Sequence, residues 1–330
     1  MNPAALARMA GVILLSAASL CAQTSKDRPC WLRDGAAPGK TTAFAMCQQG
    51  LLWSTSDGGA TWSAHETGAT VALRAVAFLN SARGFVAGDE GTILATTDGG
   101  KTWRPVTSGT KEHLRDITFI GESGWAAGFN GVIVHSADGG KTWAPQKSGT
   151  TQTIESLFFL DPQHGWAVGW AGIILRTFDG GNHWQEVKTE AASWSLASVC
   201  FRDLNNGWAV GFAGQMLRSR DGGATWKAVT SPVNSWLTSI AFDSAGRGWI
   251  TYENGLLLSQ DGGETWKAVP IAGRYFLARL IPHGDSLWAM GQSAILREMG
   301  AGKEWKKIES LAPGGSAAAI DRTADMGEPK

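Results

Sequence analysis

A short motif, Asp-Gly-Gly-x-Thr-Trp or a close variant, recurs at a nearly constant interval through the chain. Its copies begin at six aspartates that lie 40 to 42 residues apart: Asp57, Asp98, Asp138, Asp179, Asp221 and Asp261. A seventh copy, "MGAGKEW", lacks the aspartate, and its Trp305 falls 39 residues after Trp266. A period of about 40 residues that is made of short strands is typical of the blades of a β-propeller.

Each period divides into four short apolar runs that are separated by glycine-containing turns. In one period the runs cover residues 73–78, 84–88 and 92–96, and a last strand starts near Thr102. The second run recurs as "GFVAG", "GWAAG", "GWAVG", "GWAVG" and "GWITY", with "AFAMC" before these and "LWAMG" after them. Both counts give seven, so the sequence predicts an all-β, seven-bladed propeller of four-stranded antiparallel blades.

A terminal strand is expected to close the ring, because the first blade has no clear innermost strand before "TTAFAMC". The C-terminal "SAAAID", residues 316–321, resembles the innermost strands "LRAVAF" and "LTSIAF", so we expect it to complete blade one. The alternative donor is "CWLRD", residues 30–34. The predicted propeller covers residues 23–321, and residues 322–330 are expected to form a flexible tail.

The repeated motif has a structural explanation. A short aspartate side chain accepts hydrogen bonds from nearby backbone N–H groups, and the two glycines adopt the positive φ values of a tight hairpin. The tryptophan that follows is large enough to fill the wedge between diverging sheets. We therefore interpret the six aspartates as turn-forming residues, with no catalytic or metal-binding role.

The N-terminus has the pattern of a secretory signal, predicted over residues 1–22. Arg8 precedes the apolar run of residues 12–20, and Ala22 lies at a cleavage position, which predicts Sec-type export to the periplasm or the exterior. Lipid attachment at Cys21 is the less favoured alternative. Export permits a disulfide, for which Cys30 and Cys47 are the expected pair, whereas Cys200 lies in an apolar strand and is expected to be buried.

Overall charge argues against two classes of partner. The chain has 29 basic and 29 acidic residues, so it has no net field that would attract nucleic acid or an anionic membrane. No Cys-x-x-Cys motif or cysteine–histidine cluster occurs, and the sequence predicts neither a metal site nor a cofactor.

Large aromatic residues are expected on the face opposite the Asp-Gly-Gly turns. Three of them follow the second strands of adjacent blades, and two more lie in loops that enter innermost strands: Phe129, Trp170, Phe212, Trp194 and Trp236. Clustered exposed aromatics indicate an interaction surface. The alternative is that these rings pack on one another and cap the central channel.

Two arginines begin consecutive innermost strands and are expected near the channel mouth. Arg74 and Arg115 could bind a carboxylate of a partner. The alternative is that they pair with the neighbouring acids Asp89, Glu90 and Glu112.

The pattern Ser/Thr-x-Asp-x-Gly-x-Thr-Trp is the Asp-box, or BNR repeat, which occurs in sialidases and in many non-catalytic propellers. Together with segments such as "HGWAVGWAGIILRTFDGGNHW", it makes residues 40–310 resemble the photosystem II stability and assembly factor family. That resemblance implies an exported, non-catalytic propeller. Family members hold assembling membrane-protein subunits, partly through surface arginines. The expected partner is therefore a protein segment or a membrane-protein assembly intermediate, and the expected state is a monomer.

The second hypothesis is a carbohydrate-active propeller, either a glycan-binding protein or a glycoside hydrolase. A sialidase needs a tyrosine nucleophile and an N-terminal arginine motif; the chain has two tyrosines, Tyr252 and Tyr275, and lacks that motif. A glycosidase with two carboxylates could use one acid from each of two sets. The first set is Asp89 and Glu90, and the second is Glu253 and Asp116.

Overall fold

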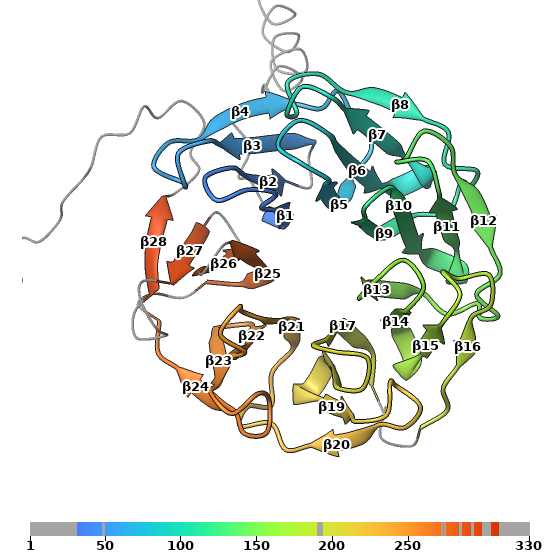
Figure 1. The fold of residues 1–330 in the computed structure, drawn as a ribbon. Coiled ribbons are helices and arrows are strands. Elements are labelled where there is room, and N and C mark those ends of the chain that lie inside the picture. Colours follow the sequence, from blue (N-terminus) through green and yellow to red (C-terminus); the bar gives the residue numbers. More distant parts are fainter. Residues whose placement is uncertain are drawn as a thin grey trace, which may run out of the picture. The chain divides into compact units, whose positions relative to one another are not determined.

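The structure, a computed structural model, describes residues 32–47, 50–189, 194–271, 273, 275–283, 286–291, 294–298 and 305–309. All of these lie in one compact unit, Cys30–Leu311. They form seven four-stranded antiparallel sheets arranged in a ring (Figure 1), which confirms the predicted propeller. None of these residues belongs to a helix with the length and apolar character needed to cross a membrane. The predicted signal segment and C-terminal tail lie outside the described residues.

Every blade consists of four strands that are consecutive in the chain, named A to D from the channel outward. Blades one to four hold β1 (Leu32–Ala36), β2 (Ala43–Cys47), β3 (Leu51–Thr55), β4 (Ser63–Glu66); β5 (Leu73–Phe78), β6 (Gly84–Gly88), β7 (Ile93–Thr96), β8 (Arg104–Val106); β9 (Leu114–Ile120), β10 (Ser123–Gly128), β11 (Ile133–Ser136), β12 (Ala144–Gln146); β13 (Ile154–Phe159), β14 (Gly165–Gly169), β15 (Ile174–Thr177) and β16 (Gln185–Glu186).

Blades five to seven repeat the same order. They hold β17 (Leu196–Phe201), β18 (Gly207–Gly211), β19 (Met216–Ser219), β20 (Lys227–Val229); β21 (Leu237–Phe242), β22 (Gly248–Tyr252), β23 (Gly255–Ser259), β24 (Lys267–Val269); β25 (Leu277–His283), β26 (Ser286–Gly291), β27 (Ala294–Glu298) and β28 (Trp305–Glu309).

The loops fall on two faces of the ring. The Asp-Gly-Gly turns join strands C and D and contact the loops between strands A and B, as the Gly99 N–H does when it donates to the Ala82 carbonyl at 2.8 Å. The loops between strands B and C contact those that enter strand A, as the Asp89 N–H does with the Ala72 carbonyl at 2.9 Å. We call these two sides the Asp-box face and the BC-loop face.

The Asp-Gly-Gly turn has the predicted hydrogen bonds. In blade three the Asp138 carboxylate accepts from the backbone N–H of Thr142 at 3.0 Å, from its hydroxyl at 2.7 Å, and from the Ser136 hydroxyl at 2.8 Å. Gly139 and Gly140 have φ values of 73° and 81°, a region that glycine enters without steric cost. The turn is therefore a self-contained structural unit that ends strand C and begins strand D.

The strand B tryptophans of blades three, four and five join each of these blades to the next. Trp125, Trp166 and Trp208 are almost fully buried. Their indole N–H groups donate to backbone carbonyls of the following blade's Asp-Gly-Gly turn, at 2.9, 3.0 and 3.2 Å. Each indole thus fills the wedge between two sheets and satisfies a turn carbonyl at the same time.

The prediction of the closing strand is wrong, because the innermost strand of blade one is β1 and not residues 316–321. β1 pairs antiparallel with β2, so the alternative donor at the N-terminal side supplies the strand. Residues 316–321 themselves lie outside the described residues. Each blade is thus built from its own consecutive strands, and the ring closes by packing blade one against blade seven.

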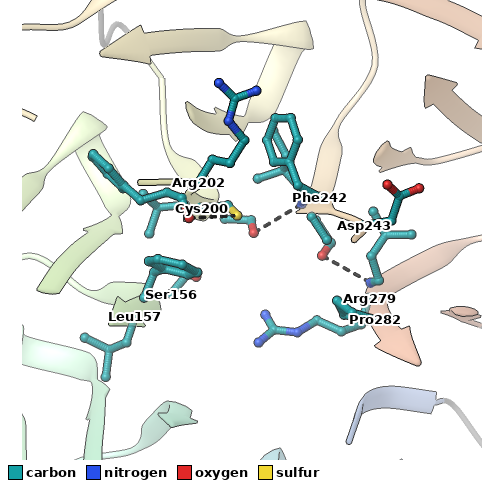
Figure 2. Close-up of a pocket in the computed structure, with 16 residues that line it drawn as sticks. Ser156, Leu157, Cys200, Arg202, Phe242, Asp243, Arg279 and Pro282 are labelled. Carbon is teal, nitrogen blue, oxygen red and sulfur yellow. Dashed lines mark hydrogen bonds between the residues drawn. The ribbon is translucent and has the colours of Figure 1, made fainter. Parts of the chain in front are cut away.

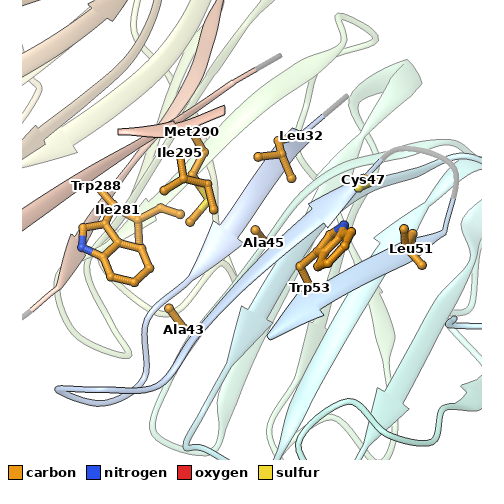
Figure 3. Packing of buried hydrophobic residues seen from close by; sticks show 10 residues of the cluster. All are labelled: Leu32, Ala43, Ala45, Cys47, Leu51, Trp53, Ile281, Trp288, Met290 and Ile295. Atoms are coloured by element: carbon orange, nitrogen blue, oxygen red, sulfur yellow. The ribbon is translucent and has the colours of Figure 1, made fainter. Parts of the chain in front are cut away.

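That closing interface is apolar and tightly packed (Figure 3). Leu32 and Ala45 of blade one share a buried cluster with Ile281 and Met290 of blade seven. Gly35 permits the close approach, since a Cβ at this position would lie 2.6 Å from both the Met290 sulfur and the Phe44 carbonyl oxygen.

Two cysteine predictions have different outcomes. Cys200 is buried and free, as expected. Cys47 is in a disulfide, but Cys30 lies outside the described residues, so the pairing of these two cysteines stays a prediction.

Candidate functional site

The BC-loop face carries four turns with the same backbone geometry. They are the short 3₁₀ turns η3 (Asp89–Gly91), η4 (Phe129–Gly131), η5 (Trp170–Gly172) and η6 (Phe212–Gly214). In each turn the middle residue has a left-handed φ between 52° and 58°, although none is glycine. The final glycine is required in η3, η4 and η6, because a Cβ there would collide with the carbonyl of a neighbouring loop. The turns therefore form a rigid platform for their first side chains.

Four of the five predicted aromatic residues are strongly exposed on this face. Trp170, Trp194, Phe212 and Trp236 have 47%, 53%, 50% and 42% of their surface exposed, and Phe129 is partly buried. We call these five residues the aromatic arc. The strand and loop positions that the repeat predicted are thus correct, and the rings lie on blades three to six.

The rings of the arc contact one another in pairs. The ring centroids lie 6.0 Å apart for Phe129 and Trp170, and 5.8 Å apart for Trp194 and Phe212. Trp236 instead contacts Phe276, at 5.9 Å, a residue that the sequence analysis did not select. The alternative that the rings cap the channel predicts buried rings, whereas four of the five remain about half exposed. An exposed group of tryptophans of this size is unusual on a protein surface.

Both predicted arginines are paired with acids. Arg74 binds Asp89 through two hydrogen bonds of 2.9 and 2.8 Å, as the alternative expected. Arg115 binds Glu155 of the next blade at 2.9 to 3.1 Å, and its guanidinium lies 5.6 Å from the Phe129 ring centroid. Glu155 also accepts from the Trp170 indole at 2.6 Å, so this pair orients one ring of the arc.

A third arginine, Arg33, lies at the same channel mouth as Arg74 and Arg115, and it was not predicted from the sequence. Arg33, Arg74 and Arg115 occupy the same second position of β1, β5 and β9. Arg33 forms no salt bridge with any described carboxylate, and burial together with the charges of Arg115 and Arg74 lowers its pKa. The sequence did contain an indication of the equivalence of Arg33 and Arg115, because "LRD" occurs at both 32–34 and 114–116. This equivalence was overlooked because residues 316–321 were preferred as the innermost strand of blade one.

The three arginines face aromatic rings across a pocket of about 130 Å³ at the centre of the ring. The opposite wall includes Trp236 and Phe276. The BC-loop face thus has three arginines on blades one to three, two of them paired with acids, and aromatic rings mainly on blades four to seven. Such a surface can bind apolar side chains and a carboxylate together.

Below this mouth, three charged residues meet inside the channel. Arg279 of β25 lies 3.0 Å from Asp34 and 3.6 Å from Asp116, measured from guanidinium nitrogen to carboxylate oxygen. Asp34 and Asp116 also accept backbone N–H groups of the next blade, from Val76 at 2.9 Å and Leu157 at 2.7 Å. Burial raises the pKa of both carboxyls, that of Asp116 to about 6.

A second channel pocket, of about 410 Å³, lies among blades four to seven (Figure 2). It is lined by innermost strands, and the Arg279 side chain extends into it beside Ser156 and Leu157. Cys200 also lines it, and burial raises the pKa of this thiol to about 12, which makes it a poor nucleophile.

The acids of the glycosidase hypothesis have separate structural contacts. Asp89 is bound by Arg74 and by His113 at 3.2 Å, and the Arg74 hydrogen bond is the main cause of its lowered pKa. Asp116 is buried against Arg279, whereas Glu253 is exposed in the turn between β22 and β23.

Comparison with known proteins identifies relatives of the whole propeller. Residues 66–148, 143–230 and 224–321 match the family described as photosynthesis system II assembly factor YCF48. A search of curated protein sequences finds no match to the chain.

Solved structures share the fold at low identity. A structure of YCF48 bound to D1 peptide has a TM-score of 0.67 and 22% identity, and the alignment covers 82% of this chain and 91% of the other. YCF48 from Cyanidioschyzon merolae has a TM-score of 0.58 and 22% identity, covering 73% and 86%. An inactive virginiamycin B lyase from Staphylococcus aureus has a TM-score of 0.70 at 13% identity, covering 82% and 94%. At this level of identity the structures support the fold, which hosts both enzymes and binding proteins.

Proposed function

Because the chain belongs to the photosystem II assembly factor YCF48 family, we propose that it is a non-catalytic protein that binds a segment of a partner protein across its BC-loop face. The observation that carries this proposal is the exposure of the aromatic arc, in which Trp170, Trp194 and Phe212 each keep about half of their surface in contact with solvent. Aromatic side chains contribute much of the binding energy in protein interfaces.

The chemistry of the partner follows from the two halves of the face. Apolar side chains of a bound segment would pack on Trp194 and Phe212, and a carboxylate would lie near Arg33. This guanidinium is the best placed of the three, because Arg74 and Arg115 already bind carboxylates of the protein itself. The related YCF48 structure with a bound D1 peptide is consistent with a peptide as ligand.

Site-directed photocrosslinking in the producing organism tests where the partner binds. A photoreactive benzoylphenylalanine in place of Trp194 should crosslink to a protein segment that mass spectrometry identifies. The matched control is the same group in place of Phe178, which is also 50% exposed but adjoins the Asp-Gly-Gly turn on the opposite face. Equal crosslinking from both positions, or crosslinks from position 194 to glycans alone, would contradict the proposal and favour the carbohydrate hypothesis.

A further inference from the structure

The second residue of strand A changes its chemical character around the ring. It is an arginine in blades one to three, a glutamate in blade four, and alanine or threonine in blades five to seven: Arg33, Arg74, Arg115, Glu155, Ala197, Thr238 and Ala278. All seven line the pocket at the channel mouth. Glu155 is the one acid of this series, and it lies on the blade that carries Trp170 of the aromatic arc.

In blades two and four this residue binds the first residue of the BC turn of its own blade. Arg74 binds Asp89 through two hydrogen bonds of 2.9 and 2.8 Å. Glu155 accepts a hydrogen bond from the Trp170 indole at 2.6 Å. In blade five the corresponding residue is Ala197, which has no polar side-chain atom. Strand A therefore orients the first turn residue in some blades and not in others.

Trp170 is fixed through its backbone as well as its side chain. Its N–H donates to the Thr153 carbonyl at 2.9 Å, and its carbonyl accepts from the Ile173 N–H at 3.1 Å. The bond from its indole to the Glu155 carboxylate is short and charge-assisted, which makes it stronger than a hydrogen bond between neutral groups. The ring is nevertheless 47% exposed. It thus combines a fixed orientation with a large accessible surface.

Glu155 is in turn held by the preceding blade. The Arg115 guanidinium binds both of its carboxylate oxygens at 2.9 to 3.1 Å. The Arg115 and Glu155 side chains are only 16% and 18% exposed. The arginine balances the charge of the carboxylate and fixes its position, so the carboxylate can hold the indole.

We propose that Glu155 is a positioning residue, which holds the Trp170 indole ready to receive an apolar side chain of the bound segment. This inference rests on the proposed binding at the BC-loop face. The indole N–H is already bound to Glu155, so Trp170 offers a ligand only the apolar surface of its ring. A ring that is already ordered loses little conformational entropy on binding, which raises the affinity.

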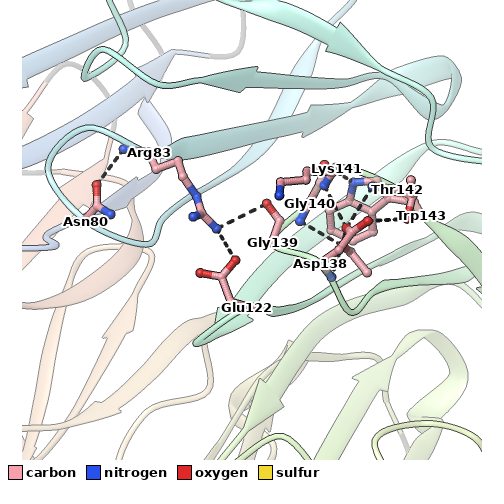
Figure 4. Close-up of polar contacts among 10 residues, drawn as sticks. Asn80, Arg83, Glu122, Asp138, Gly139, Gly140, Lys141, Thr142 and Trp143 are labelled. Carbon is pink, nitrogen blue, oxygen red and sulfur yellow. Dashed lines mark hydrogen bonds and ion pairs between the residues drawn. The ribbon is translucent and has the colours of Figure 1, made fainter.

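NMR spectroscopy of the free propeller tests the contact without a partner. The indole N–H signal of Trp170 is identified by its absence in Trp170→Phe. Glu155→Ala should accelerate exchange of this proton with water at least tenfold, whereas Glu155→Gln, which keeps an acceptor oxygen, should do so less than threefold. The matched control is Glu122→Ala, which removes an acid that Arg83 binds at 2.6 Å on the Asp-box face (Figure 4). An unchanged Trp170 signal in Glu155→Ala would overturn the proposal.

Binding of the protein that crosslinks to position 194 tests the effect on affinity. Glu155→Ala should weaken this binding about threefold to tenfold, the range expected when one side chain must be ordered on binding. Glu155→Gln should bind within twofold of the wild type. In a Trp170→Phe background, which has no indole N–H, Glu155→Ala should weaken binding less than twofold. An equal loss in both backgrounds would contradict the proposal, since Glu155 would then act through Arg115 or through the fold.

An alanine scan of the crosslinked segment tests the chemistry of the side chain that packs on Trp170. One position of the segment should lose affinity on replacement in the wild type but not in Trp170→Ala, and that position should carry an apolar side chain. An acidic, basic or amide side chain at the coupled position would contradict the inference.

The outcomes distinguish this inference from the proposed function. Unchanged binding in Trp170→Ala would mean that the proposed binding site is wrong. If Trp170→Ala weakens binding at least tenfold and Glu155→Ala does not weaken it, only the positioning role is wrong. Should Glu155→Ala fold poorly because it leaves Arg115 unpaired, the paired variant Arg115→Met with Glu155→Leu removes both charges. It should show the same faster exchange and the same loss of affinity.

Discussion

Two aspartates of this protein have pKa values that are shifted in opposite directions. Asp138 of a turn is partly exposed, and hydrogen bonds from Thr142, chiefly from its hydroxyl, lower the pKa of the carboxyl well below its ordinary value. Asp116 of the channel is buried, and burial raises its pKa to about 6 in spite of the nearby Arg279. The first group favours the folded state as an anion, and the second favours it when protonated.

The raised pKa of Asp116 predicts a pH-dependent stability. The ordinary pKa of an aspartate is 3.8. Between about pH 4 and pH 6 the folded protein therefore retains a proton on Asp116 that the unfolded chain has lost. The free energy of unfolding should fall as pH rises through this window, by about 3 kcal/mol, since one pKa unit corresponds to about 1.4 kcal/mol. Below pH 4 and above pH 6, Asp116 makes no further contribution to the pH dependence of the free energy of unfolding.

Urea unfolding of the wild type and of Asp116→Asn at several pH values measures this effect. The difference in unfolding free energy between the two proteins cancels the contribution of titrating groups that do not interact with Asp116. It should change between pH 4 and pH 6 and be constant from pH 7 to pH 8. Parallel curves across the whole range would show that Asp116 titrates normally in the folded state.

At the scale of strands and turns, one repeated connection joins blades three, four and five each to the following blade. The strand B tryptophan of one blade donates to a turn carbonyl of the next, as Trp166 does with Gly222 at 3.0 Å. This contact explains why the same sequence pattern specifies both the hairpin and the blade interface.

Trp166→Phe should therefore destabilise the protein by about 1–3 kcal/mol, because the Gly222 carbonyl loses its partner and the wedge loses volume. Chemical denaturation measures the change. The control Trp194→Phe alters an exposed ring and should change stability by less than about 0.5 kcal/mol. An equal loss of stability in the two variants would mean that the interblade hydrogen bond does not stabilise the protein.

The sequence predicted the strands better than it predicted the inner surface of the ring. The repeats of strand B and of the turns set seven blades and the positions of the arc, because both motifs have strict local requirements. β1 was harder to assign, because it shares only its "LRD" with β9, and Arg33 and Asp34 do not fit the small-residue pattern of "LTSIAF" in β21. Their environment is created by distant residues, Arg279 among them, that only the closed ring brings close.

On the scale of the whole molecule, ring closure divides the BC-loop face into chemically different halves. Blades one to three contribute Arg33, Arg74 and Arg115 to the channel mouth, and blades four to six contribute the exposed indoles. No single repeat contains this arrangement. It depends on the order of the blades, which is why a sequence pattern that is uniform in its turns produces an asymmetric surface.

The most direct test of the account measures binding of the protein that crosslinks to position 194. Removal of two arc side chains, in Trp170→Ala with Phe212→Ala, should weaken that binding more than tenfold and leave the melting temperature within about 3 °C, because both rings are half exposed. The matched Phe178→Ala variant should bind like the wild type. If the double variant binds its partner as tightly as the wild type, the aromatic arc is not the binding surface.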